Sequence, residues 1–359
     1  LETLTGKDVL EAYFTELGGE VLYNTVMVKL DRDGDRVGGV WATNADGETV
    51  LVHAARGVVV ATGGYGKNAA MMDALQPETQ ALYSLNIARP GCTGDGIKAC
   101  LWAGAAMDGV HSSMLFDRCA LPVGAVAGAA TEGGMFFNMG SHPWLKVNLN
   151  GERFANEGSG VYDWMLHAGA TLPDGTYCTI FDADWAAQAE QMDMHGCARM
   201  YPYENGAPAS ETVDTIGGQL ASLIEAGYVQ EAQTIEELAQ KLELPVETFC
   251  ATVERYNKLA EAGMDEDFGK EPFRLLPLAT PPFYGVRNTG VLLCTLDGIR
   301  IDTEARALRA DGTPIEGLFV VGNDSGNYFD RSYPNTLTGG AAGRTITFGR
   351  IAGKAAARG

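Results

Sequence analysis

Two glycine-rich turns, each directly after a short apolar run, are the part of this sequence that most clearly indicates chemistry. In the first, three valines at 58–60 lead into Ala61-Thr62-Gly63-Gly64, and in the second, "GLFVVGNDSG", a similar run ends at Gly322. A glycine turn lets the backbone approach a bound molecule closely, and its N–H groups can bind an anionic or electron-rich atom. A third turn of this kind is "TGDG", residues 93–96. The pattern predicts a ligand at the ends of two buried strands.

The elements that must position these turns are strands and helices with clear boundaries. Residues 20–54 predict three strands joined by tight Asp-Gly turns, which lead into the run at 58–60. Helices are expected after the "TGDG" turn and from about residue 339, and the glycines at 343, 349 and 353 predict close packing of the second helix on a sheet or ligand. A short amphipathic helix, apolar at 10, 13, 14 and 17, is expected near the start.

Composition excludes several classes of partner. The formal net charge of −20 over 359 residues argues against binding to a nucleic-acid backbone. No apolar run approaches the length of about 18 residues that a membrane span needs. The seven cysteines show no metal-ligand spacing, so we expect mostly buried thiols and no metal site. The composition therefore predicts a globular protein that does not bind nucleic acid.

Six blocks, in their order and spacing, resemble the flavoprotein subunit family of fumarate reductases, succinate dehydrogenases, urocanate reductases and 3-ketosteroid dehydrogenases. They are "VVVATGGYGKN", "ARPGCTGDGIKACLWAGA", "NLNGERFANE", "TVERYNKLAEAGMDEDFGK", "GLFVVGNDSG" and "TFGRIAGKAA", and together they extend over nearly the whole chain. The resemblance implies FAD as the cofactor and an α/β fold, with a split Rossmann-like FAD-binding domain and an inserted α+β cap. The expected parts are residues 1–112 and 285–359 for the FAD-binding domain and 113–284 for the cap that holds the substrate.

The resemblance also implies which residues contact FAD. Ala61 to Gly64 are expected at the diphosphate and ribose, and Val26 at the adenine. Asn323 and Asp324 stand where the family usually has Gly-Glu at the ribityl chain, and the helix after Gly339 is expected to stabilise the negative charge of reduced flavin. The full expected set is Val26, Ala61, Thr62, Gly63, Gly64, Thr93, Gly94, Asp95, Gly322, Asn323, Asp324, Thr338, Gly339 and Gly340.

The sequence departs from the family at its beginning. The family's first strand, with its G-x-G-x-x-G turn for the diphosphate, does not occur here. We therefore expect roughly 100 or more further residues before Leu1 in the intact protein, and weak or no FAD binding by this chain alone. The compartment stays open, and a soluble bacterial protein that is exported is one alternative.

The charged residues specific to fumarate reduction are also absent. Aligned on the shared blocks, Phe137 and Gly140 stand at the Glu and Arg of the family's proton relay, and Val161 stands at the proton donor. Thr336 and Cys294 stand at a substrate-binding Arg and His. We therefore expect that the protein is not a fumarate reductase in the strict sense.

Two tyrosines and one arginine are predicted as catalytic. Tyr162 is next to the position of the missing proton donor, and Tyr333 precedes the flavin helix, where the resemblance to ketosteroid dehydrogenases implies a carbonyl-binding Tyr. A phenol can polarise a carbonyl and donate a proton, and Arg331 could bind a carboxylate. The alternatives are that both tyrosines pack in a core and that Arg331 is solvated or pairs with the cofactor. Arg118 and Arg199, in the expected cap, could face the cleft, and the alternative, which we favour, is a position at the surface.

The predicted function is FAD-dependent transfer of hydride between flavin N5 and the C=C bond of an α,β-unsaturated carbonyl or carboxylate, in the direction of ene reduction. One alternative is a 3-ketosteroid-type dehydrogenase. An alternative of another class is a catalytically silent fragment or subunit of a larger flavoprotein. Besides the substrate, the expected partner is an electron donor, another protein or domain that carries flavin or haem.

Overall fold

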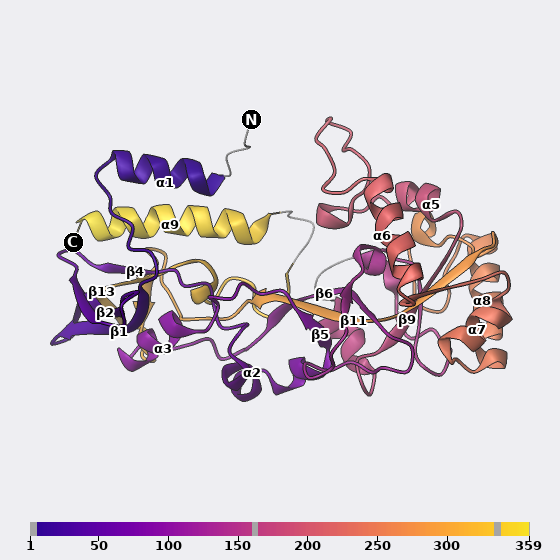
Figure 1. Cartoon of the computed structure of the whole chain (residues 1–359), viewed down its shortest axis with the longest axis horizontal. Helices are drawn as coiled ribbons and strands as arrows, with labels where there is room; N and C mark the ends of the chain where they lie inside the picture. Colours follow the sequence, from indigo (N-terminus) through magenta and orange to yellow (C-terminus); the bar gives the residue numbers. More distant parts are fainter. Residues whose placement is uncertain (1–5, 160–163, 334–338, 359) are drawn as a thin grey trace.

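The computed structural model describes residues 6–159, 164–333 and 339–358. Within these ranges the strands form three sheets (Figure 1). The two small sheets lie at one end of the long axis of the molecule, and helices α5, α6, α7 and α8 lie at the other end. The largest sheet lies between them and extends toward these helices.

The first small sheet is an antiparallel meander with the order β1-β2-β3. Its strands are β1 (Val26–Asp33), β2 (Arg36–Thr43) and β3 (Thr49–His53). The connecting turns contain Gly34 at φ 59° and Gly47 at φ 81°, a backbone conformation that favours glycine. The predicted three-stranded meander is therefore confirmed.

The second small sheet brings the two glycine turns together. It consists of β12 (Arg306–Leu308), β13 (Pro314–Val320) and β4 (Val58–Val60), in the order β12-β13-β4. β4 and β13 run parallel, with Leu318 paired to Val58 and Val320 paired to Val60. Because parallel strands end at the same edge of a sheet, the turns that follow β4 and β13 lie next to each other.

The third sheet has seven strands, and β11 is at its centre. Its main path runs β7-β6-β11-β9-β8, and β5 and β10 also pair with β11. All residues of β6 and β9 are buried, as is expected for strands that are covered on both faces. The strands are β5 (Tyr83–Asn86), β6 (Ser113–Leu121), β7 (Met135–Phe136), β8 (Leu145–Val147), β9 (Tyr177–Asp182), β10 (Val229–Ala232) and β11 (Phe283–Thr295).

Helices connect and cover these sheets. The α-helices are α1 (Gly6–Glu16), α2 (Ala69–Leu75), α3 (Asp95–Trp102), α4 (Trp164–His167), α5 (Trp185–Gln191), α6 (Val213–Glu225), α7 (Ile235–Leu242), α8 (Val246–Ala262) and α9 (Gly340–Arg358). The 3₁₀-helices are η1 (Pro77–Ala81), η2 (Asn138–Ser141), η3 (Glu157–Ser159), η4 (Gly169–Thr171), η5 (Gly196–Ala198), η6 (Pro272–Arg274) and η7 (Gly322–Asp324).

The helical pair α7 and α8 has clear start and stop signals. Thr234 accepts a hydrogen bond from the N–H of Glu237 at the start of α7, Pro245 precedes α8, and Gly263 ends α8 at φ 66°. The apolar faces of both helices share a buried core with β8 and β9 that includes Leu238 and Phe249.

Two helices pack less closely than the sequence predicts. The amphipathic helix α1 forms as expected, but none of its residues is buried. A Cβ atom at Gly343, Gly349 or Gly353 of α9 would meet nothing within 4 Å. The expectation that these glycines allow close packing of α9 on a sheet is therefore wrong for the described part of the chain.

The predicted division into domains can be placed on this fold. Position 113 is the first residue of β6, and position 285 lies inside β11. The seven-stranded sheet joins β5, from before position 113, to strands of the expected cap. The division at 112 and 284 stays a prediction. Among the described residues, no helix combines the length and apolar character needed to cross a membrane.

Candidate functional site at the end of the parallel strands

The carboxylate of Asp324 binds the glycine turn that follows β4. It accepts hydrogen bonds from the backbone N–H groups of Thr62, Gly63 (3.2 Å) and Gly64 (2.9 Å), and from the hydroxyl of Thr62 (3.1 Å). Asp324 is completely buried. Burial raises its pKa above the ordinary value, and the hydrogen bonds from Gly64 and Thr62 act in the opposite direction. Two predicted cofactor-binding segments therefore contact each other, through N–H groups suited to an anion.

The third glycine turn lies at the same place. The N–H of Gly94 donates to the carbonyl of Gly64 (3.0 Å), and the N–H of Gly96, in the first turn of α3, donates to the hydroxyl of Thr62 (3.2 Å). Gly94 has φ 76°, which favours glycine. The hydroxyl of Thr93 donates to the carboxylate of Asp95 (2.5 Å). The structure thus brings together the predicted contacts from 62–64, 93–96 and 322–324.

A cavity of about 640 Å³ lies beside these turns, and we call it the α9 cavity. One part of its lining comes from Cys294, Asn323 and the first residues of α9. Another part comes from the predicted cap and includes Phe116 and Cys197. The full lining is Arg89, Cys92, Met114, Phe116, Gly196, Cys197, Tyr203, Pro208, Ser210, Leu293, Cys294, Asn323, Tyr333, Gly339, Ala341 and Ala342.

Tyr333 lines this cavity at the start of α9, where the sequence predicts it. Its side chain is 5% exposed, and its ring packs 4.7 Å from that of Phe329, measured between centroids. The hydroxyl oxygen accepts a hydrogen bond from the N–H of Ala341 (3.0 Å). The phenol therefore binds one of the N–H groups that a helix leaves unpaired at its first turn.

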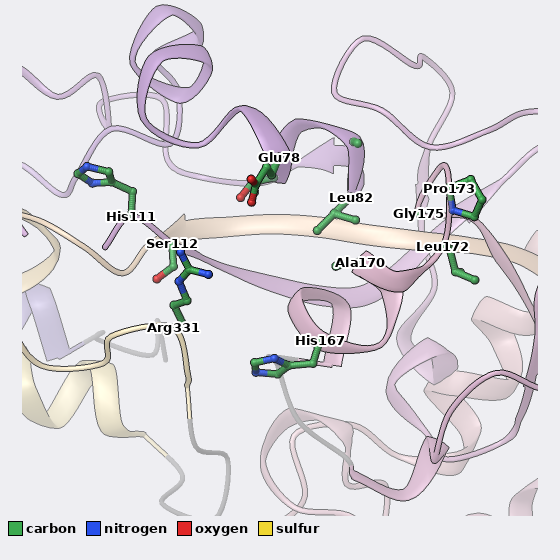
Figure 2. Close-up of a pocket in the computed structure, with 12 residues that line it drawn as sticks. Glu78, Leu82, His111, Ser112, His167, Ala170, Leu172, Pro173, Gly175 and Arg331 are labelled. Carbon is green, nitrogen blue, oxygen red and sulfur yellow. The ribbon is translucent and has the colours of Figure 1, made fainter. Parts of the chain in front are cut away.

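Arg331, the predicted carboxylate clamp, lines a different cavity. This second cavity of about 370 Å³ is also lined by His111, Ser112 and His167, and Figure 2 shows Arg331 extending toward Ser112. The ring Nδ1 of His111 lies 2.7 Å from the carboxylate of Asp297, which is buried. Tyr333 and Arg331 are therefore close in sequence but line separate cavities.

The remaining predicted residues are not brought to the α9 cavity by described contacts. Val26 is the first residue of β1, 58% exposed, and pairs with Thr43 in the meander. Tyr162 and Thr338 lie outside the described residues. Ala61 follows β4, and Gly340 begins α9.

Two arginines are buried against expectation: sequence reasoning did not single out the first, and it favoured a surface position for the second. Arg344, one turn into α9, donates to the side-chain oxygen of Asn323 (3.0 Å) and is 3% exposed, and burial lowers its pKa. Arg118 is 2% exposed, so its expected surface position is wrong. The sequence signal for Arg344 was a charged residue among the small residues of α9. Arg118 lies within the apolar run of β6, which was a similar signal.

These residues can be tested for their fit to FAD. Gly64 and Gly94 both have positive φ, and a Cβ atom on Gly94 would collide with Met71, so both turns require glycine. The α9 cavity lies at the N-terminus of α9, whose N–H groups favour negative charge. These features fit the flavin end of FAD, and Asn323 and Gly339, which line the cavity, would contact it there. The N–H groups of Thr62, Gly63 and Gly64 fit an anionic group, although Asp324 binds them here.

Comparison with known proteins assigns the chain to a family. A family model described as an FAD binding domain matches residues 2–336. The chain is 29% identical over 356 residues to the vinyl phenol reductase of Lactiplantibacillus plantarum, covering 98% of this chain and 70% of that protein. It is 30% identical over 353 residues to the NADH:acrylate oxidoreductase of Vibrio harveyi, covering 97% of this chain and 31% of that protein.

Proteins named for action on steroids also match nearly the whole of this chain. The chain is 30% identical over 368 residues to a 3-oxosteroid 1-dehydrogenase of Mycolicibacterium smegmatis and spans 59% of its length. The 3-ketosteroid delta1-dehydrogenase from Sterolibacterium denitrificans superposes with a TM-score of 0.72 at 24% identity, covering 98% of this chain and 62% of that one, which shows a shared fold. The predicted family, fold class and cofactor are confirmed: the chain belongs to the FAD-binding family of flavoprotein oxidoreductases that act on CH–CH groups.

Proposed function

We propose that the protein is an ene reductase, which uses FAD to reduce the C=C bond of an α,β-unsaturated carbonyl or carboxylate. The observation that carries this proposal is the position of the Tyr333 hydroxyl. It is held at the N-terminus of α9, in a cavity that residues of the predicted cap also line. Relatives named for the reduction of vinyl phenol, acrylate and fumarate support the same reaction class.

FAD, when bound, supplies the hydride from N5 of its flavin ring. The residues of the chain have three tasks around that transfer. The oxygen of Tyr333 accepts the N–H of Ala341, so its proton can be donated to a substrate carbonyl oxygen, where negative charge develops. The first turn of α9 favours negative charge on a bound group. Apolar side chains such as Phe116 and Leu293 line the cavity and exclude water.

A dehydrogenase acting in the opposite direction on a steroid-like ketone is the second candidate. The apolar part of the cavity lining, Met114, Phe116 and Leu293, suits a large apolar substrate. The 30% identity to a 3-oxosteroid 1-dehydrogenase favours the same reading. The same hydroxyl of Tyr333 would then polarise the 3-keto oxygen of the substrate.

In the proposed reductase, electrons come from outside this chain. The described residues contain no cluster of three or more His, Cys, Asp or Glu suited to a metal. We propose a flavin- or haem-bearing protein or domain as the donor. The chain spans 31% of the length of the NADH:acrylate oxidoreductase, so a donor domain on the same polypeptide is compatible with this size.

The experiment is a flavin spectrum followed by two half-reactions. The intact protein is purified and its absorbance near about 450 nm is measured, because oxidised flavin absorbs there. The protein is then reduced with dithionite without oxygen and mixed with trans-cinnamate or acrylate. Rapid return of the absorbance supports ene reduction.

Bleaching of the oxidised protein by a 3-ketosteroid, with no reoxidation by the unsaturated acids, would instead support the dehydrogenase. A protein with a full flavin spectrum that responds to neither class contradicts both. A protein without flavin supports the third alternative, a silent fragment or subunit.

A further inference from the structure

The guanidinium of Arg118 is buried but incompletely paired. Its Nε donates to the hydroxyl of Ser141 (2.7 Å), and its Nη1 donates to the sulfur of Cys197 (3.4 Å). Its Nη2 is buried and has no hydrogen-bond acceptor among the described residues. A buried N–H group without an acceptor destabilises the protein, and one on a charged group does so more strongly. The structure therefore leaves a place for one more acceptor at Arg118.

The charges around Arg118 do not balance. Lys146 pairs with Asp117 (3.2 Å), and the hydroxyl of Ser141 links Asp117 to Arg118. His142 is neutral, since burial and then the charges of Arg118 and Lys146 lower its pKa to about 3. The neighbouring buried network consists of Arg153, Glu157, Asp265 and Lys270. Its two cations match its two carboxylates.

Because Asp117 forms an ion pair with Lys146, Arg118 is left without a carboxylate partner. An isolated charge in a protein interior is costly unless a counter-charge reaches it. A ligand that carries a negative charge would meet this requirement.

Arg118 lies directly behind the lining of the α9 cavity. Cys197, whose sulfur accepts from Nη1, lines that cavity. Phe116 lines it as well, and the guanidinium carbon of Arg118 lies 5.2 Å from the centroid of the Phe116 ring. Cys197 has a short side chain with one torsion to its sulfur, so a carboxylate at the cavity lining can take the place of the sulfur at Nη1 and also pair with Nη2.

We propose that Arg118 is the subsite for the negatively charged end of the ligand in the α9 cavity, and that this ligand is a carboxylic acid. The inference rests on the proposed function, because it selects the unsaturated acid over the unsaturated ketone as substrate. Arg118 acts as a specificity-determining residue. A guanidinium offers two parallel N–H donors to a carboxylate, a geometry that neither an amide nor a ketone can match.

The test compares an acid with its neutral counterpart. Dissociation constants for trans-cinnamate and trans-cinnamamide are measured by calorimetry on the flavin-containing protein, for the unchanged protein, Arg118→Met and Arg118→Lys. Arg255→Met is the matched control, since Arg255 is paired with Asp267 at the surface of α8. We expect Arg118→Met to weaken cinnamate binding by about 10- to 100-fold, and cinnamamide binding by less than about threefold. Arg118→Lys should weaken cinnamate binding less than Arg118→Met does. Arg255→Met should leave the dissociation constants of both ligands unchanged.

Several results would overturn the inference. An equal loss for both ligands, unchanged cinnamate binding, or no cinnamate binding by the unchanged protein each contradict it. If Arg118→Met does not fold, which a melting curve reveals, Arg118→Lys decides: an unchanged preference for the acid contradicts a planar two-donor subsite. Failure of the proposed function gives a different result, because cinnamate would then bind with Arg118-dependent affinity yet leave the reduced flavin unoxidised.

Discussion

At the scale of the residue, Tyr333 combines a structural and a proposed chemical task in one hydroxyl. The oxygen accepts a hydrogen bond from the N–H of Ala341, and this bond fixes the phenol at the first turn of α9. The ring is buried against Phe329, so the hydroxyl has little freedom to leave the cavity lining. A donor that is fixed before the substrate arrives is more effective than a mobile one, because no reorganisation is needed in the transition state.

Replacing Tyr333 by Phe removes the hydroxyl and keeps the ring. We expect reduction of trans-cinnamate by the pre-reduced protein to slow by about 10²–10³, equivalent to roughly 3–4 kcal/mol in the barrier. The lost contact to Ala341 should lower the free energy of unfolding by about 1 kcal/mol, as for a helix cap. The rate is measured by rapid mixing. Tyr328→Phe, a neighbouring ring that is 47% exposed, is the control and should keep its rate.

An unchanged rate in Tyr333→Phe would assign this phenol to packing alone. Loss of the flavin from the variant would show instead that Tyr333 supports the cofactor.

Individual residues also show how far the sequence could be read. Tyr333 was found because it precedes a glycine-rich helix start, which is a local pattern. Arg118 could not be placed, because its burial depends on Ser141 and Cys197, which reach it only in the folded chain. Arg331 was predicted as a possible carboxylate clamp from its residue type alone, and it lines a different cavity from Tyr333.

At the scale of the element, the glycines of the turns and the glycines of α9 differ in the space around them. Gly96 lies at the start of α3, where a Cβ atom would collide with the side chains of Thr62 and Val60. Gly349 lies in α9, where a Cβ atom would meet nothing within 4 Å. The parallel pairing of β4 with β13 could be predicted from the apolar runs. The open surroundings of the α9 glycines could not, because a small-residue pattern does not reveal which face of the helix packs against the sheet.

Alanine at these two positions should therefore change stability in opposite directions. We expect Gly96→Ala to lower the free energy of unfolding by about 2 kcal/mol, since the methyl group separates α3 from β4 and lengthens the hydrogen bond to Thr62. Gly349→Ala should raise it by up to about 1 kcal/mol, because alanine is the better helix former. Urea unfolding followed by circular dichroism measures both. Equal effects at the two sites would contradict the packing described here.

At the scale of the whole molecule, one strand and one ionic network hold distant segments together. β11 pairs with β5, β6, β9 and β10, so it joins the first part of the chain to the expected cap. Arg153 binds the carboxylates of Glu157 (2.8 Å) and Asp265 (2.6 Å), which connects the loop after β8 to the loop after α8. The pairing of β11 with β5 and the contact of Arg153 with Asp265 could not be read from a local pattern, because each joins segments that are far apart in the sequence.

The ionic network makes stability depend on acid pH. Burial alone would raise the pKa of Asp265, but the hydrogen bonds from Arg153 and from the N–H of Lys270 lower it to about 2. A carboxylate with a lowered pKa in the folded state stabilises the protein above its ordinary value near about 4, and this contribution is lost as the pH falls toward the folded value. The free energy of unfolding should therefore decrease between about pH 4 and pH 2.

Asp265→Asn removes this titration. We expect the variant to lose about 2 kcal/mol of stability at pH 7 and to show a flatter decrease below about pH 4 than the unchanged protein. Urea unfolding at a series of pH values measures both effects. Asp33→Asn, at an exposed position of β1, is the control and should match the unchanged protein. A variant whose pH profile is parallel to that of the unchanged protein would contradict the role of Asp265.

The contact between Asp324 and the first glycine turn has a kinetic consequence. The carboxylate comes from a segment 262 positions further along the chain, and the fold places it against the N–H groups of Thr62 and Gly64. It is a tethered competitor, with the high effective concentration of any intramolecular ligand. An anion arriving from solution can occupy these N–H groups only when the carboxylate withdraws. Its apparent association rate constant is then lowered by the fraction of time that this contact is open.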